Sequence, residues 1–451
     1  MGKSLGHRGR LALAVAGALC GVSVAQEAEQ LDVIGEGDEP TQLETVVVTA
    51  TRVGEPDFDL PVAIDVLDRQ VIQDRNPGVL ISEVLPRVRG TFAQEEQIMI
   101  RGFGGRSQFG TRGVRLIADG IPASTPDGQG GPGLFDLGSA GNIEVMRGGF
   151  SALYGNHSGG VVQVFTEDGP QEPTLSARLM GGSDGTWIAG TRLGGQSGKV
   201  NYVLDAYHAE TDGYRDWSRS TKEQAIAKLR VALDSGGTLS LIANAMNLPD
   251  SQDPLGLTAE QVKQNPRQAA ASALEFETRR TLDNMQGGLI LEQPLTDTDS
   301  LRAMVYAGTR GNEQFLAVPL ANQNAITAAG GVSTFDRRFA GGSLWWSHET
   351  AFADGPLTLT LGGEYDRSAE DRTGYLNQLG ERDALKRDED NSVDSWGTFI
   401  QGKWAFAPDW CVELGLGERR VGVEAALVEL VEQHRRNAGE HRVRLRGSER
   451  A

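Results

Sequence analysis

Residues 171–417 consist of short segments in which apolar and polar residues alternate, separated by turns. A period of two predicts β-strands, because successive side chains of a strand point to opposite faces. We expect about ten or eleven strands of about ten residues each. One apolar face is typical of the lipid-facing wall of a transmembrane barrel, and equally of a soluble antiparallel sandwich. Leu239, Leu241, Ala243 and Ala245 alternate in this way with Thr238, Ser240, Ile242 and Asn244.

Two further features favour the membrane wall over the sandwich. The chain begins with an export signal, described below, and the alternating segments carry girdle-like aromatic residues. These are Trp345, Trp346, Trp404 and Phe406. The turn at 234–237 is short and is predicted on the periplasmic side. Long polar links are predicted as outside loops at 248–275, 312–334 and 370–392.

Residues 1–25 have the organisation of a secretory signal peptide. Lys3, Arg8 and Arg10 form a basic end, followed by an apolar run and a small-residue cleavage site. The next segment, 26–43, is acidic and poor in apolar residues, which predicts a disordered lead-in. The sequence therefore predicts export beyond the inner membrane.

A β-prone heptad follows the lead-in and precedes a Gly-Glu-Pro turn. An isolated strand in a flexible tail cannot satisfy its own backbone, so it suits pairing with the sheet edge of a partner protein. The alternative is an ordinary first strand of the next domain. The heptad is Glu44, Thr45, Val46, Val47, Val48, Thr49 and Ala50.

Charge and cysteine usage exclude several classes of function. The formal net charge is −18; without the three basic residues of the leader, 40 basic residues face 61 acidic ones, which gives −21. Such an acidic chain is not expected to bind nucleic acid, because phosphate binding requires basic patches. Cys20 lies in the leader and Cys411 stands alone, so no disulfide framework is predicted. The six histidines are scattered, and we predict no metal site.

The stretch 96–160 is rich in glycine and contains short strands that end at glycine turns. A GxGxxG pattern occurs at 128–133, but Pro132 interrupts it and no strand-to-helix context surrounds it. A GxSxG pattern at 181–185 joins two β-segments, which predicts a hairpin turn and not a nucleophile. We therefore predict no catalytic residues, no cofactor and no enzyme.

Residues 44–168 carry, in order, motifs that resemble those of the TonB-dependent outer-membrane receptors. The heptad looks like a TonB box, and five later segments look like successive plug-domain motifs. Gly149 and Arg89 stand where that family often has proline, and both changes fall in turns. The matching segments are ETVVVTATR, PVAIDVLDRQVI, IMIRGFGGRS, VRLIADGIP, NIEVMRGGFSALYG and SGGVVQVFT.

The resemblance implies an all-β transmembrane barrel with an α+β plug domain inside it. It places the TonB box at 44–52, the plug at 56–170 and barrel strands at 171–417. The family's barrel has about 22 strands, so this chain would hold about half of one.

The last segment, 418–451, is expected to be an anomalous non-barrel tail, since alternation gives way to helical spacing. The hypothesis that follows is a reading-frame shift or gene break after about Gly417. The alternative to a working receptor is then a truncated, non-functional fragment.

Three groups of site residues follow from the resemblance. The heptad 44–50 would bind TonB, the energised periplasmic partner. Arg101 and Arg147 would pair with barrel glutamates and lock the plug, or would be plain surface arginines at strand ends. The apical plug loops would face the ligand with Arg106, Arg112, Asp127 and Gln129.

The expected partners are TonB, outer-membrane lipid and a small ligand. Paired hydrogen bonds from arginines suit a small anionic or metal-chelating compound. The segment 101–130 is similar to the branch of the family that includes the pyrroloquinoline-quinone receptor. A ferric siderophore or ferric citrate is the alternative ligand class.

Overall fold

The computed structural model describes most of the chain after residue 46. All described residues belong to one compact unit, Thr45–Ala451. The predicted signal peptide, lead-in and most of the heptad lie outside them. The described residues are 47–48, 55–56, 63–73, 81–94, 97–101, 111–147, 157, 159–325, 327–353, 355–407, 410–429 and 443–450.

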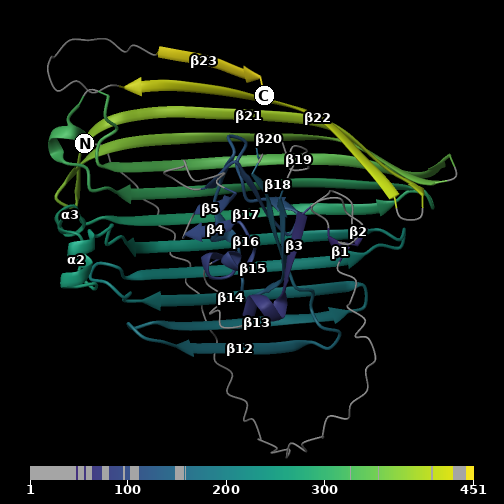
Figure 1. Ribbon diagram of the computed structural model, residues 1–451, viewed down its shortest axis with the longest axis horizontal. Helices are drawn as coiled ribbons and strands as arrows, with labels where there is room; N and C mark the ends of the chain where they lie inside the picture. Colours follow the sequence, from purple (N-terminus) through teal and green to yellow (C-terminus); the bar gives the residue numbers. More distant parts are fainter. Residues whose placement is uncertain are drawn as a thin grey trace, which may run out of the picture. The chain divides into compact units, whose positions relative to one another are not determined.

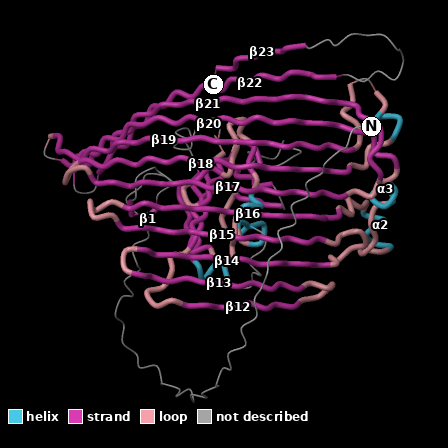
Figure 2. The backbone as a smooth tube through the Cα atoms, turned by 180° about the vertical axis from the view of Figure 1, so that it is seen from behind, coloured by secondary structure: helices cyan, strands magenta, loops and turns pink. Residues whose placement is uncertain are grey.

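Twelve strands form one large antiparallel sheet in which each strand pairs with its neighbour in sequence. Figures 1 and 2 show them side by side in that order, with β12 and β23 at the two edges. The strands are β12 (Thr174–Gly181), β13 (Trp187–Ser197), β14 (Val200–Thr211), β15 (Ser220–Ala232), β16 (Thr238–Gln252), β17 (Arg279–Pro294), β18 (Asp299–Phe315), β19 (Val332–Phe352), β20 (Gly355–Gln378), β21 (Glu381–Ala407), β22 (Trp410–Glu429) and β23 (Val443–Arg450).

The two faces of the large sheet differ as the alternation predicts. Leu241 is 44% exposed, while Ser240 and Ile242 beside it are buried. Val305 is 57% exposed between buried Met304 and Tyr306. One face of the sheet is therefore apolar and uncovered, and the other is occupied. This confirms the predicted period of two.

Aromatic residues border the apolar face at both ends of the strands. Trp404 contacts Phe352 and Phe406, with ring centroids 5.2 and 5.4 Å apart. At the other end Tyr365 on β20 lies opposite Trp396 on β21. On β20 the band between them runs from about Leu357 to Tyr365, close to the 9–11 residues that a membrane-crossing strand needs. No helix in the described part of the chain has the length and apolar character of a membrane span.

The links between strands differ in length at the two ends of the sheet. The link 253–278 contains α2 (Ala259–Gln264) and α3 (Ala271–Glu275), and the link 316–331 contains α4 (Leu320–Gln323). Figure 2 shows α2 and α3 at one end of the strands.

The link 370–392, which we expected to be an outside loop, is instead strand on both sides of a two-residue turn. Leu379 and Gly380 have φ of 53° and 92°, the left-handed values of a tight hairpin turn. The prediction of a loop was wrong because strands that extend past an apolar band carry charge on both faces, so a polar segment can still be strand.

The predicted non-barrel tail, 418–451, is also wrong for its described parts. β22 continues to Glu429 in register with β21, and β23 pairs with β22. Backbone pairing to the edge of β21 prevails over the helical spacing of side chains. The argument for a break after Gly417 rested on strands ending there, and they do not.

The segment before the large sheet folds as a smaller mixed domain. Its five-stranded sheet has the order β3-β10-β11-β7-β8, with β11 parallel to β7. Asp68 caps the following helix α1 (Arg69–Gln73), since its carboxylate accepts from the Val71 N–H at 2.8 Å. Two short 3₁₀ turns follow, η2 (Ile81–Glu83) and η3 (Leu85–Arg87).

The strands of the mixed domain are short. The sheet consists of β3 (Ala63–Asp68), β7 (Val114–Ala118), β8 (Ile121–Pro122), β10 (Ala140–Arg147) and β11 (Gly160–Thr166). Three two-stranded pairs accompany it: β1 (Val47–Val48) with β2 (Glu55–Pro56), β4 (Thr91–Gln94) with β5 (Gln97–Ile100), and β6 (Thr111–Arg112) with β9 (Gln129–Gly130).

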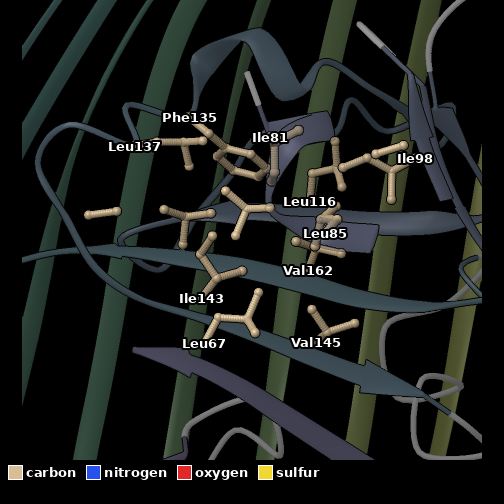
Figure 3. Close-up of a cluster of buried hydrophobic side chains, with 14 of the residues drawn as sticks. Leu67, Ile81, Leu85, Ile98, Leu116, Phe135, Leu137, Ile143, Val145 and Val162 are labelled. Atoms are coloured by element: carbon tan, nitrogen blue, oxygen red, sulfur yellow. The ribbon is translucent and has the colours of Figure 1, made fainter. Parts of the chain in front are cut away.

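A large apolar cluster holds the mixed domain together, and a smaller one of Ile117, Met146 and Val161 accompanies it. Leu116, Ile143 and Val162 from three neighbouring strands are fully buried, and Figure 3 shows Leu85 and Phe135 packed with them. Gly160 is needed where β11 begins, because its φ is +144° and a Cβ there would lie 2.4 Å from the Met146 carbonyl oxygen. The predicted α+β character of this domain is confirmed.

Candidate functional site

A polar loop of the mixed domain brings together three of the four residues predicted to face the ligand. β6 and β9 pair Arg112 opposite Gln129. The Arg112 guanidinium lies 3.2 Å from the Asp127 carboxylate, and the Thr125 hydroxyl donates to the same carboxylate. The fourth residue, Arg106, lies outside the described residues.

Arg337 of β19 reaches this loop from the large sheet. It donates to the Thr125 hydroxyl at 3.1 Å and to the Gln129 side-chain oxygen at 3.2 Å. Its Nε donates to Glu370 of β20 at 2.9 Å. Arg337 and Glu370 are both buried, so the loop is attached to the sheet through a buried, charge-assisted contact.

The charges around this loop keep Asp127 ionised. Burial alone would raise the pKa of Asp127, but the Arg337 charge, the Thr125 hydroxyl and Arg112 together lower it below its ordinary value. The Asp127 carboxylate thus lies near the guanidiniums of Arg112 and Arg337, and Arg337 is also paired with Glu370.

The position of Glu370 on β20 shows at which end of the large sheet this site lies. Glu370 lies beyond the aromatic Tyr365 on β20, toward the turn at Leu379 and Gly380. The turn lies at the same end as the long links 253–278 and 316–331. The predicted ligand-facing loop is thus at the long-link end of the sheet.

A second contact joins the mixed domain to the sheet where the chain passes from one to the other. Lys228 of β15 donates to the Thr166 carbonyl oxygen at 2.6 Å and lies 3.0 Å from Asp168. Asp119 is 3.5 Å from the same ammonium group and also accepts from the Thr166 N–H at 2.8 Å. Arg230 pairs with Asp168 as well.

Asp168 lies in the link to β12. Burial alone would raise its pKa, but Lys228 and then Arg230 lower it below the ordinary value. The carboxylate is therefore held ionised between two cations.

A third contact is centred on the buried carboxylate of Asp366 on β20. Arg419 of β22 lies 2.9 Å from it, and the Tyr306 hydroxyl donates to it at 2.7 Å. Arg115 of β7, in the mixed domain, approaches to 3.9 Å. Arg419 also binds Glu364 at 2.6 Å, so a residue of the expected tail is part of the charged interior.

The two predicted locking arginines lie at the ends of short strands of the mixed domain. Arg147 pairs with Asp65 and donates to the Arg89 carbonyl oxygen at 2.8 Å, both within the mixed domain. Its expected pairing with a barrel glutamate stays a prediction. Arg101 is exposed at the end of β5, with its backbone N–H bonded to the Gly90 carbonyl oxygen.

Sequence reasoning missed Arg337, Glu370, Lys228 and Arg419. Lys228, between Ala227 and Leu229, is a charged residue in an alternating apolar segment, which was an available signal. Arg337 and Arg419 have charged neighbours on both sides and carry no such signal. The sequence does not show which residues would be partners, because Arg337 and Thr125 are separated by 212 positions.

Comparison with known proteins decides what the mixed domain is. Residues 56–162 match the family model described as the TonB-dependent Receptor Plug Domain. The mixed domain is a TonB-dependent receptor plug. Over 180 residues the chain is 29% identical to the vitamin B12 transporter BtuB of Photobacterium profundum, a match that covers 38% of this chain and 28% of that protein.

Solved structures show the same fold beyond the plug. The unliganded ferric citrate transporter FecA superposes with a TM-score of 0.68 at 17% identity, covering 87% of this chain and 60% of that one. The siderophore receptor PiuA from Acinetobacter baumannii gives 0.64 at 14% identity, covering 87% and 62%. The chain thus spans less than two thirds of the length of these relatives, and its fold is that of a plug with part of its barrel.

Proposed function

We propose that this protein acts in the outer membrane as a TonB-dependent receptor that takes up a small anionic or metal-chelating ligand. The observation that carries the proposal is the plug loop of Thr125, Asp127 and Gln129, attached through Arg337 to the long-link end of the sheet. Relatives named as transporters and siderophore receptors support the class of function. The apolar outer face of the sheet, bordered by aromatic residues, supports contact with membrane lipid.

The heptad 44–50 is proposed as the segment that binds TonB. Its described part, Val47 and Val48, is paired in extended conformation with Glu55 and Pro56. This supports a strand-forming segment that can exchange its short local pairing for the edge of a partner sheet. Backbone hydrogen bonds would then transmit the pull that drives uptake.

Substitution of Val47 tests the proposal directly. Val47→Pro removes a backbone N–H and should abolish uptake while ligand binding at the cell surface is unchanged. Val47→Ile keeps the N–H and the β-propensity, and should transport normally. Uptake by the proline variant at the rate of the unsubstituted protein would refute the assignment of the heptad.

The ligand class is proposed from Arg112, whose side chain is half exposed beside Asp127. A guanidinium held at the rim of such a loop favours a carboxylate or a chelate that bears one. Growth rescue of a receptor-deleted host would compare pyrroloquinoline quinone, ferric citrate and a ferric siderophore. Arg112→Gln should weaken binding of the ligand that rescues growth, and rescue by none of the three would contradict this ligand class.

A further inference from the structure

A cavity of about 320 Å³ lies between the plug and the first strands of the large sheet. Three arginines line it from three different elements: Arg69 of α1, Arg178 of β12 and Arg192 of β13. In the strand order these elements are distant from β19 and β20, which hold the loop of Asp127 and Gln129. This cavity is therefore separate from the site described above.

The carboxylates near the cavity do not use all of its guanidinium donors. Glu167 is shared by Arg69, at 2.7 Å, and Arg192, at 2.9 Å. No carboxylate of the described residues lies within ion-pair distance of Arg178. Its guanidinium lies over the Tyr207 ring, 5.7 Å from the centroid, and its Nε is buried without a hydrogen-bond partner.

Asp136 and Asp205 are the next carboxyl groups, and Asp205 itself lines the cavity. One oxygen of each is buried with no hydrogen-bond partner, although Arg178 is near. Within the described part of the chain, the Arg178 guanidinium thus forms no ion pair with either carboxyl group.

Gly138 gives the Arg178 guanidinium its position. A Cβ at Gly138 would come within 2.5 Å of Nη1 and 2.7 Å of Nη2 of Arg178. The planar group therefore packs directly on the glycine backbone. A flat guanidinium held in place, with donors to spare, is suited to accept a planar or tetrahedral oxyanion through paired hydrogen bonds.

We propose that this cavity binds an oxyanion, a carboxylate or phosphate group, with Arg178 as the main donor and Arg192 as the second. The inference rests on the proposed function, since such a site between plug and sheet would bind an anionic ligand during its uptake. The anion would supply the acceptor that the Arg178 guanidinium lacks among the described residues. Its source is either a carboxylate-bearing ligand in transit or a phosphate group.

The test is a thermal unfolding titration of the full chain in detergent micelles. Citrate and inorganic phosphate are the two probes, with chloride at matched ionic strength as the reference. We expect the unfolding temperature to rise with at least one probe. Arg178→Gln should weaken that response about tenfold or more, as expected for loss of charged hydrogen bonds. Arg367→Gln, an exposed arginine with a long 3.7 Å pair, is the matched control and should respond normally.

Gly138→Ala provides a second variant in which every charge is kept. The added methyl displaces the guanidinium, so the anion response should fall while the fold persists. Response to citrate alone would identify a carboxylate ligand, and response to phosphate alone a phosphate-bearing one.

The proposal is overturned if neither probe stabilises the unsubstituted protein. It is equally overturned if Arg178→Gln lowers the unfolding temperature without changing the anion response, because Arg178 would then only balance the Asp136–Asp205 pair. Val47→Pro should leave anion binding intact. Loss of uptake with retained anion binding, or the reverse, therefore separates failure of this site from failure of the proposed transport.

Discussion

Arg337 donates to the hydroxyl of Thr125 at 3.1 Å and thereby joins a strand of the large sheet to the plug loop. The same guanidinium is neutralised by Glu370 on the neighbouring strand. The loop that carries Asp127 and Gln129 is thus held by a buried ion pair that belongs entirely to the sheet. This relationship makes the attachment of the plug testable.

Arg337→Ala should loosen the plug. It leaves Glu370 buried without its cation, a change that costs about 3–5 kcal/mol in comparable cases. Urea titration with a trypsin readout of plug cleavage measures the loss. Arg367→Ala, whose partner Asp394 is also exposed, should cost less than about 1 kcal/mol. Equal protease protection in the two variants would contradict the role assigned to Arg337.

Neighbouring arginines on β22 test whether the expected tail belongs to the sheet. Arg419→Met leaves Glu364 and Asp366 without their nearest cation, and should destabilise the fold by about 3 kcal/mol or more. Arg420→Met removes an exposed side chain and should be nearly neutral. Gel migration of unheated samples, scored against temperature, compares the two. If residues after Gly417 were outside the sheet, both variants would behave alike.

Lys228→Met should detach the plug where the chain leaves it. The substitution keeps much of the side-chain volume but removes the cation shared by Asp119 and Asp168 and the donor to Thr166. A loss of about 3 kcal/mol is expected in the trypsin-monitored urea titration. Lys199→Met, an exposed lysine paired with Asp234 in a turn, is the control. A result in which both lysine variants match the unsubstituted protein would refute this anchor.

The same contact predicts a pH dependence. The pKa of Asp168 is lowered in the folded protein from the ordinary value of 3.8, so its ionised form is stabilised by folding. Its contribution is therefore complete above about pH 4 and is lost as the pH falls through the lower folded-state pKa. The stability difference between the unsubstituted protein and Asp168→Asn should be constant from pH 5 to 7 and shrink below pH 4. A difference that grew on acidification would have the wrong sign for this mechanism.

Much of the fold follows from local sequence. Alternation such as that from Leu239 to Ala245 predicts which residues share a face of the sheet, because every second side chain of a strand points to the same side. The plug motifs and the Asp68 cap are equally local. The same reasoning failed for 370–392 and 418–429, where charged side chains hid strands whose pairing depends on the neighbouring strand and not on composition.

The candidate site, too, could be predicted from the sequence only in part. Arg112, Asp127 and Gln129 could be named from the sequence since they lie within one loop and its paired strand. The pairing of Arg147 with Asp65 could not be predicted, because Asp65 becomes its neighbour only when β3 pairs beside β10. A buried guanidinium without a partner is costly whichever carboxylate pairs with it. This cost alone therefore does not predict the partner.

The sequence by itself determined the two-part architecture, the apolar outer face and the identity of the plug, because these depend on residue period and on contiguous motifs. Only the tertiary structure decided which charges hold the parts together. Lys228, Arg337 and Arg419 meet their partners across strands far apart in the chain. Burial between plug and sheet is what gives those pairs their strength.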